Sequence, residues 1–306
     1  MSVRAATLVG LIAVLLWATL APLTVLAFGV PPLQLVAMSF TVGAMIGLGY
    51  LLLRPDARRE IRRVTLPAAL VGITGLLGFH FFYFLSLSLA PPLEANLVNY
   101  LWPLLIVLFS ALLPNTGGRL KAHHLIGALI AFAGAVLAIT KGERLPTISS
   151  DALAGYGIAL LSALTWASYS VLSRLFAGVP SSAVTLYCAA TALAGAGAHF
   201  ALEETVWPLS GLQWIAAAGL GLGPVGLAFY VWDYGCKHGD LRVLGASAYF
   251  APLLSTVLLV AFGLADGSPA LWLAALAITG GALLASKDML GRRSTASSPV
   301  KEEANA

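Results

Sequence analysis

Charged side chains are scarce in this sequence, whereas hydrophobic ones are abundant. Of its 306 residues, 10% are charged and 59% are hydrophobic, and the mean hydropathy is +0.91. Ordinary water-soluble domains contain about 25% charged and about 45–50% apolar residues, so this composition excludes that class of protein. Most of the chain is therefore expected to lie in a lipid bilayer.

Cysteine is almost absent, and the short motifs of common enzyme classes are missing. The two cysteines, Cys188 and Cys236, fall in different apolar segments, which offers neither a disulfide framework nor a metal-binding spacing. Histidines and carboxylates do not recur at ligand spacing, so no metal site and no cofactor are predicted. Without a GxSxG or HExxH motif, an intramembrane enzyme is not indicated. No connecting segment is long enough to be the extramembrane domain of a receptor or scaffold.

The middle of the apolar segments also lacks charge. Glu94 and Asp233 stand near segment ends, where they can reach the membrane interface. A central carboxylate would suggest a proton relay, and its absence favours a facilitative carrier or weak proton coupling through His80. Sugar nucleotides and other phosphorylated substrates would call for a central lysine or arginine, and none is present.

Ten stretches are close to the roughly 20 residues that an α-helix needs to cross about 30 Å of hydrocarbon. They are continuously apolar without strict alternation, which indicates helices rather than the strands of a barrel. The sequence thus predicts an all-α membrane protein with ten transmembrane helices. Their expected ranges are 6–28, 32–53, 66–89, 93–113, 122–140, 153–175, 182–201, 211–235, 241–263 and 269–287.

Basic residues are divided very unevenly between the two sets of alternate loops. Fifteen of the seventeen lysines and arginines fall on one side, and only Lys141 and Arg144 fall on the other. Because positive residues in short loops stay cytoplasmic, the N-terminus and the C-terminus are both predicted to be cytoplasmic. The net charge of +4 follows from this bias, so a nucleic-acid partner is not supported.

The sequence repeats itself about 149 residues along. The run from Tyr100 to Pro103 (YLWP) returns at 249–252 (YFAP), and Trp17 returns as Trp166. At an offset of 147, the Gly-Ala pair at Gly134 matches the pair at Gly281. Five helices per copy is an odd number, so the second copy enters the membrane from the opposite side. We predict repeats at 1–141 and 153–290, an outer linker at 142–152, and a disordered cytoplasmic tail at 291–306.

Bulky aromatic and amide side chains lie near the middle of several segments, although Trp and Tyr usually collect at the membrane interfaces. Asn96, Asn99 and Tyr100 share one helix face through i, i+3, i+4 spacing. Two further pairs, each three residues apart, also share a face of their helix: His80 with Tyr83, and Trp166 with Tyr169. These side chains must face protein or a water-filled cavity, and interhelical hydrogen bonding by Asn96 is the competing interpretation. The candidate substrate-binding residues are Trp17, His80, Tyr83, Asn96, Asn99, Tyr100, Trp102, Trp166, Tyr169 and Tyr249.

His80 is the histidine placed deep inside an apolar segment. Its functional interpretation is a neutral hydrogen-bonding group for a substrate carboxylate or amine, or a proton-linked switch. The alternative is a histidine whose hydrogen bonds are satisfied within the core. Sequence alone leaves both interpretations open.

Four prolines interrupt apolar segments at depth, where they remove backbone hydrogen bonds. Two of them, Pro103 and Pro252, occupy matched places in the repeat. We predict hinges at these sites, with simple helix packing as the alternative. The candidate hinge residues are Pro22, Pro103, Pro224 and Pro252.

Ten spans, an inverted five-plus-five repeat, a tryptophan in the first span of each half and a glycine-rich last span of each half resemble the drug/metabolite transporter superfamily, in its EamA-type branch. The resemblance covers about 6–288. The run from Asn96 to Pro103 (NLVNYLWP) is similar to the YddG-type aromatic amino acid exporters of bacterial inner membranes.

A cavity of rings, amides and one histidine suits a net-neutral ligand such as a zwitterionic amino acid with an apolar side chain. We therefore expect a multi-pass inner-membrane carrier, not an enzyme, that exports small neutral metabolites, foremost amino acids, by alternating access between its halves. The alternative is a multidrug or other metabolite exporter of the same superfamily. The expected partners are a small-molecule substrate and the bilayer, and the protein is expected to be a monomer.

Overall fold

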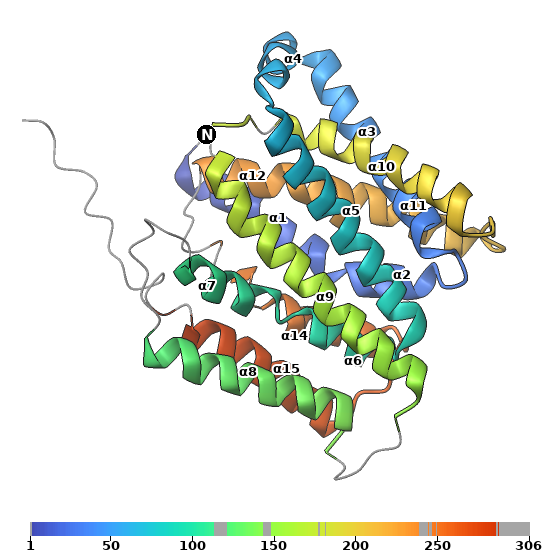
Figure 1. Cartoon of the computed structure of the whole chain (residues 1–306), viewed down its shortest axis with the longest axis vertical. Helices are drawn as coiled ribbons and strands as arrows, with labels where there is room; N and C mark the ends of the chain where they lie inside the picture. Colours follow the sequence, from blue (N-terminus) through green and yellow to red (C-terminus); the bar gives the residue numbers. More distant parts are fainter. Residues whose placement is uncertain are drawn as a thin grey trace, which may run out of the picture.

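The computed structural model describes residues 2–112, 121–142, 148–176, 178–180, 182–238, 244, 247–248, 250–285 and 287. Within these ranges the chain forms helices and no strand, which confirms the predicted all-α fold (Figure 1). Tyr249 and the tail predicted at 291–306 lie outside the described residues. In chain order the elements are α1 (Val3–Ala18), α2 (Leu20–Leu26), α3 (Pro32–Leu53), α4 (Pro55–Glu60), η1 (Ile61–Arg63), α5 (Leu66–Leu89), α6 (Pro92–Asn99), α7 (Trp102–Leu112), α8 (Ala122–Thr140), α9 (Ser150–Leu172), η2 (Ser173–Phe176), α10 (Ala183–Leu202), α11 (Gly211–Leu222), η3 (Gly223–Leu227), α12 (Ala228–His238), α14 (Ala251–Ala261) and α15 (Pro269–Ala285).

Seven helical stretches of the described chain are long and apolar enough to cross a membrane, and each matches a predicted segment. The other three predicted segments hold shorter helices: α6 and α7 around a break, α14, and α15. The seven stretches are Val3–Leu26, Pro32–Leu53, Leu66–Leu89, Ala122–Thr140, Ser150–Leu172, Ala183–Leu202 and Gly211–Trp232.

Four pairs of helices make the most extensive contacts: α8 with α15, α3 with α10, α5 with α9, and α1 with α12. Figure 1 shows α8 and α15 side by side along one edge of the molecule. Their backbones approach so closely that neither glycine has room for a side chain. A Cβ atom on Gly127 would lie 2.5 Å from the Gly281 carbonyl oxygen, and one on Gly281 would lie 2.5 Å from the Gly127 carbonyl oxygen. Small residues permit this close packing in membrane helices.

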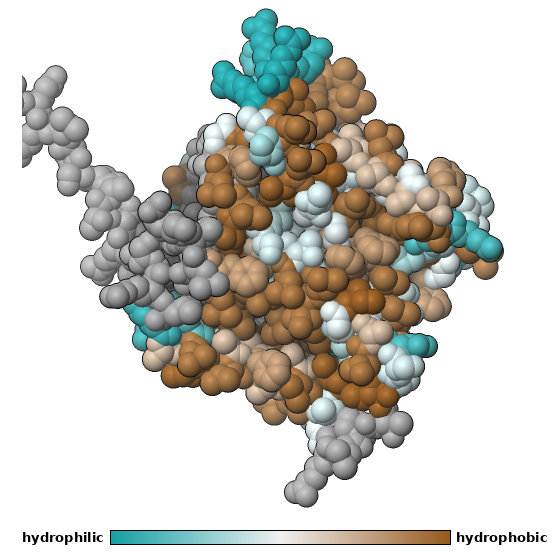
Figure 2. Space-filling view, viewed as in Figure 1, coloured by the Kyte–Doolittle hydropathy of each residue, from teal (hydrophilic) through white to brown (hydrophobic). Residues whose placement is uncertain are grey.

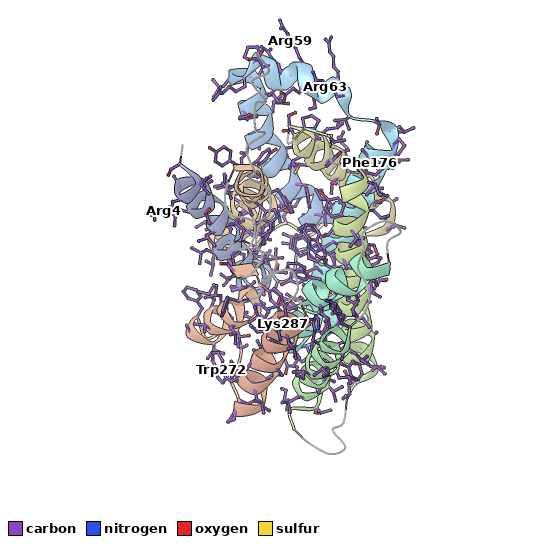
Figure 3. The ribbon with its side chains drawn as sticks, turned by 90° about the vertical axis from the view of Figure 1, so that its left-hand side faces the viewer. Arg4, Arg59, Arg63, Phe176, Trp272 and Lys287 are labelled. Carbon is purple, nitrogen blue, oxygen red and sulfur yellow. The ribbon has the colours of Figure 1, made fainter. Side chains whose placement is uncertain are left out.

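The outer surface of the bundle is apolar and the charges gather at its ends. Exposed side chains include Phe132 on α8, Leu193 on α10 and Ile215 on α11. Figure 2 shows hydrophobic residues over most of the visible face and a hydrophilic cluster at the top, where α4 lies. Arg59 and Arg63 project from that end in Figure 3. Such a surface matches a lipid environment rather than water.

Each of the four predicted proline sites coincides with an interruption or an end of a helix. Thr19 separates α1 from α2 shortly before Pro22, and α6 stops at Asn99 before α7 begins at Trp102. Pro224 lies in η3, a single π-helical turn, and Pro252 is the second residue of α14. A proline lacks the N–H group for the preceding turn and clashes with its carbonyl, which explains each break.

Candidate functional site

A small cavity lies where the broken helices α1–α2, α6–α7 and α11–α12 meet α5 and α9. Its volume is about 30 Å³, which holds about two water molecules. Seven of the ten predicted binding residues line it, together with one predicted hinge proline. The lining residues are Trp17, Leu20, Phe79, His80, Asn96, Asn99, Tyr100, Trp102, Trp166 and Pro224.

Trp166 on α9 is the centre of the aromatic wall. Its ring centroid lies 4.8 Å from that of Phe79, 5.3 Å from that of Tyr169 and 5.8 Å from that of Phe229. Trp102 approaches it edge-on at 6.4 Å. Rings at these separations stabilise one another beyond their buried area, so the wall has a defined shape. Tyr169 supports Trp166 but is not among the residues that line the cavity.

Trp17 on α1 completes the aromatic surface from the other side. It contacts Trp232 with centroids 4.9 Å apart and Phe229 with centroids 6.5 Å apart. Phe229 therefore touches both tryptophans and joins the rings of α1, α9 and α12 into one cluster. An apolar side chain that enters this cavity would be surrounded by π faces and edges.

Sequence reasoning missed Phe79, Leu20, Phe229 and Trp232. Phenylalanine and leucine are ordinary residues of a membrane helix, so their type carries no signal. The repeat did contain a signal for Phe229 and Trp232. Phe229 follows His80 by 149 positions, and Trp232 follows Tyr83 by the same interval. Applying the offset to the two residues of α5 would have identified both rings of α12.

Asn96 acts as a bridge between helices. The Tyr83 hydroxyl on α5 donates to the Asn96 Oδ1 atom at 2.8 Å, and the Asn96 Nδ2 atom donates to the Ser255 Oγ atom on α14 at 3.0 Å. The Tyr100 hydroxyl shares Ser255 as a hydrogen-bond partner. These bonds favour the interhelical interpretation of Asn96. Tyr83 is fully buried and lies behind the cavity wall, where its hydroxyl positions Asn96.

Asn99 differs from Asn96 in that its side chain leaves an acceptor unsatisfied. The residue is 2% exposed, and its Oδ1 atom has no hydrogen-bond partner among the described residues. A buried polar atom in this state costs about 1–3 kcal/mol. Because Asn99 lines the cavity, a ligand that donates a hydrogen there, such as an ammonium group, would remove that cost.

His80 is held in one orientation by its surroundings. Its Nδ1 atom lies 2.9 Å from the Leu76 carbonyl oxygen, and the rings of Phe40 and Phe79 meet it edge-to-face at 4.8 Å each. A carbonyl can only accept, so Nδ1 carries the hydrogen and Nε2 of the neutral ring is an acceptor. The histidine is thus partly satisfied by its own helix, and the residue lines the cavity.

The described lining contains no charged side chain, which leaves rings, amides, a hydroxyl and an imidazole. Glu94 lies in the first turn of α6, where it is buried and forms an ion pair with Lys141. Pro22 and Pro252 are buried at their helix breaks, while the Pro103 side chain and all of Tyr249 fall outside the description. The described cavity suits a ligand without net charge.

Comparison with known proteins gives matches over nearly the whole chain. The sequence pattern of the EamA-like transporter family matches residues 4–140 and again 153–287. The aromatic amino acid exporter YddG of Ancylobacter novellus is 47% identical over 293 residues, which cover 96% of this chain and 100% of that protein. The exporter of the same name from Escherichia coli is 28% identical over 300 residues, or 93% of this chain and 97% of the relative.

A crystal structure of a protein 47% identical to this chain has a closely similar fold. The two superpose with a TM-score of 0.73, over 94% of this chain and 99% of that one.

Proposed function

The chain belongs to the EamA-like transporter family, and we propose that it exports small neutral metabolites, foremost aromatic and other apolar amino acids. It is a transporter and not an enzyme, and it is a multi-pass protein of the bacterial inner membrane. Its partners are a small-molecule substrate and the bilayer, and we expect it to act as a monomer.

The observation that carries this proposal is the division of the cavity wall into an aromatic part and a polar part. Trp17, Trp102 and Trp166 would cover an apolar side chain, and Phe79 would close the surface beneath it. The Asn99 oxygen and the His80 Nε2 atom are acceptors for a substrate ammonium group. Tyr100 lines the same space, and its hydroxyl can donate to a carboxylate.

We propose ten spans arranged as two inverted halves, 1–141 and 153–290, joined by an outer linker at 142–152, with both termini cytoplasmic. Two glycine contacts support the repeat: Gly127 meets Gly281, and Gly134 meets the Ala274 carbonyl oxygen at 3.0 Å from its Cβ position. The 147-residue offset exchanges the two contacts, since it relates Gly127 to Ala274 and Gly134 to Gly281. The family pattern also matches the chain twice, once in each half.

Alternating access would come from the broken helices. The cavity holds about two water molecules, far less than an amino acid, so a substrate can enter only when the wall opens. We propose that α2, α6–α7, η3 and α14 bend at Pro22, Pro103, Pro224 and Pro252 to open the cavity to one side and then the other. Because the sequence places no carboxylate at the centre of a span, we propose that transport runs down the substrate gradient, with weak proton coupling through His80 as the alternative.

Within this proposal the predicted residues take different roles. Trp17, Trp102, Trp166, Tyr100, Asn99 and His80 contact the substrate. Tyr83 and Asn96 hold α5, α6 and α14 together, and Tyr169 supports Trp166. Tyr249 is retained as a substrate contact from the repeat, because it occupies the place of Tyr100 in the second half.

Counterflow in proteoliposomes tests the proposed function. Vesicles loaded with unlabelled L-phenylalanine and given no ion gradient should take up labelled phenylalanine and tryptophan faster than leucine, and leucine faster than glutamate. The order follows from a ring-lined cavity without a charged partner. Folded protein that exchanges no member of the panel would contradict amino acid export and shift the assignment to the multidrug or other metabolite alternative.

A further inference from the structure

Three hollows follow one another along α2 and α5 from the central cavity to the end of the molecule where Lys141 lies. Leu20 lines the central cavity, Thr24 a second cavity of about 40 Å³, and Phe28 a third, larger hollow of about 540 Å³. Leu20 and Thr24 are one helical turn apart on α2, and Phe28, which also lines the second cavity, follows just past the end of this helix. On the facing helix, His80, Phe84 and Leu87 make the same progression.

The third space, here called the outer hollow, is the polar end of this series. It is lined by the last residues of α5, the last residues of α8 and the start of α9, among them Ser88, Thr140, Lys141, Ser149 and Tyr156. Its volume of about 540 Å³ is within the usual range of small-molecule sites. In the proposed orientation it opens on the side away from the cytoplasm.

Lys141 is the charged residue of the described lining, and its place is fixed by a buried partner. Its Nζ atom lies 2.7 Å from the Glu94 Oε1 atom, and the two side chains are 52% and 4% exposed. Glu94 is therefore buried, while Lys141 lines the hollow with a half-exposed side chain. The backbone of Lys141 has φ 53°, which turns the chain sharply at the end of α8. A carboxylate without its counterion would be costly at this depth.

Resting on the proposed function, we propose that Lys141, positioned by Glu94, is an outer docking site for the carboxylate of the exported amino acid. The substrate would reach it after leaving the central cavity, since Asn99 is five residues from Glu94 along α6, or about 7 Å of helix. The ammonium end would face the carbonyl ends of α5 and α8, which also border the hollow and favour positive charge.

The test compares the two faces of the membrane. In proteoliposomes of known orientation, L-phenylalanine and L-phenylalaninamide, which lacks the carboxylate, compete with labelled phenylalanine from either side. For Lys141→Gln we expect the preference for the acid over the amide to fall about fivefold at the outer face, because a half-exposed ion pair contributes at most about that factor. The preference at the cytoplasmic face should stay unchanged.

Three variants complete the test. Lys141→Arg keeps the charge and should keep the preference, and Glu94→Gln should weaken it because the lysine loses its anchor. Lys287→Gln removes an exposed charge two residues beyond the end of α15 and should change nothing. Thermal unfolding of each purified variant shows whether it is folded.

The outcomes separate the two proposals. Wild-type protein that exchanges no amino acid overturns both. Wild-type exchange with an unaltered acid-to-amide preference in folded Lys141→Gln overturns the docking site alone. A fall of equal size at both faces also overturns it, since that result assigns Lys141 to helix packing instead of ligand contact.

Discussion

The Asn96 amide donates a hydrogen bond to the Ser255 hydroxyl across 159 positions of sequence, and this bond joins α6 to α14. Both residues are buried, with exposed fractions of 1% and 0%. A bond of this kind holds two broken helices together at the wall of the cavity. It also makes the cavity sensitive to changes that never touch a ligand.

Ser255→Ala should lower stability more than it lowers transport. The change leaves the buried Asn96 Nδ2 atom without a partner, which costs about 1–3 kcal/mol. Thermal unfolding in detergent measures the loss. Ser86→Ala is the matched control, because the Ser86 hydroxyl is equally buried and bonds only to the Tyr83 carbonyl of its own helix. Equal melting temperatures for both variants would show that the bridge contributes nothing.

Asn99→Leu should have the opposite signature. Replacing a buried amide whose oxygen has no partner among the described residues with an apolar side chain of similar size removes a cost of about 1–3 kcal/mol, so the protein should become no less stable. Counterflow of phenylalanine should nevertheless fall, because the substrate ammonium loses its acceptor. Asn96→Leu, in contrast, leaves the Tyr83 and Ser255 hydroxyls without their hydrogen bonds to Asn96 and should destabilise the protein. A transport rate unaffected by Asn99→Leu would remove Asn99 from the site.

Trp166→Ala should lower phenylalanine transport about tenfold, since it removes the ring that contacts Phe79, Trp102 and Phe229. Leucine transport should fall less, because a smaller side chain uses less of the aromatic wall. Trp214→Ala is the control: this ring is 45% exposed on α11, away from the cavity. If both substrates decline in parallel with the amount of folded protein, Trp166 is a packing residue.

Gly281→Ala should greatly reduce the yield of folded protein, while its neighbour Gly280→Ala should not. A Cβ atom on Gly281 would lie 2.5 Å from the Gly127 carbonyl oxygen, whereas one on Gly280 meets nothing within 4 Å. At Gly280 the change should add up to about 1 kcal/mol through helix propensity. Size-exclusion profiles and melting temperatures compare the two. Similar behaviour would mean that α8 and α15 can separate at little cost.

Much of the site could be predicted from sequence because its residues are out of place in a lipid-facing helix. Trp17, Asn99 and Trp166 would be costly or unusual at mid-span, so their types alone pointed to a protein-lined space. Phe79 could not be found in this way, since a phenylalanine suits a lipid-facing position equally well. Only the packed structure shows that its ring lies against Trp166.

Helix breaks were also predictable, whereas contacts between distant residues were not. A proline specifies where a helix loses a hydrogen bond, and the chain ends α1 at Ala18, one turn before Pro22. The pairing of Glu94 with Lys141 depends instead on how α6 and α8 pack. The sequence placed both residues near the same membrane face, but it did not predict that they form an ion pair.

The contact of α8 with α15 uses the same surface from each half, because Gly127 meets Gly281 as Gly134 meets Ala274. That is the self-complementary geometry of an isologous dimer interface, in which one patch binds its own copy across a two-fold axis. A five-helix protein inserted in both orientations could assemble through this surface without any fusion. In the proposed topology the linker holds the two orientations in a single polypeptide, so the two halves can differ at matched positions: His80 in one, Phe229 in the other.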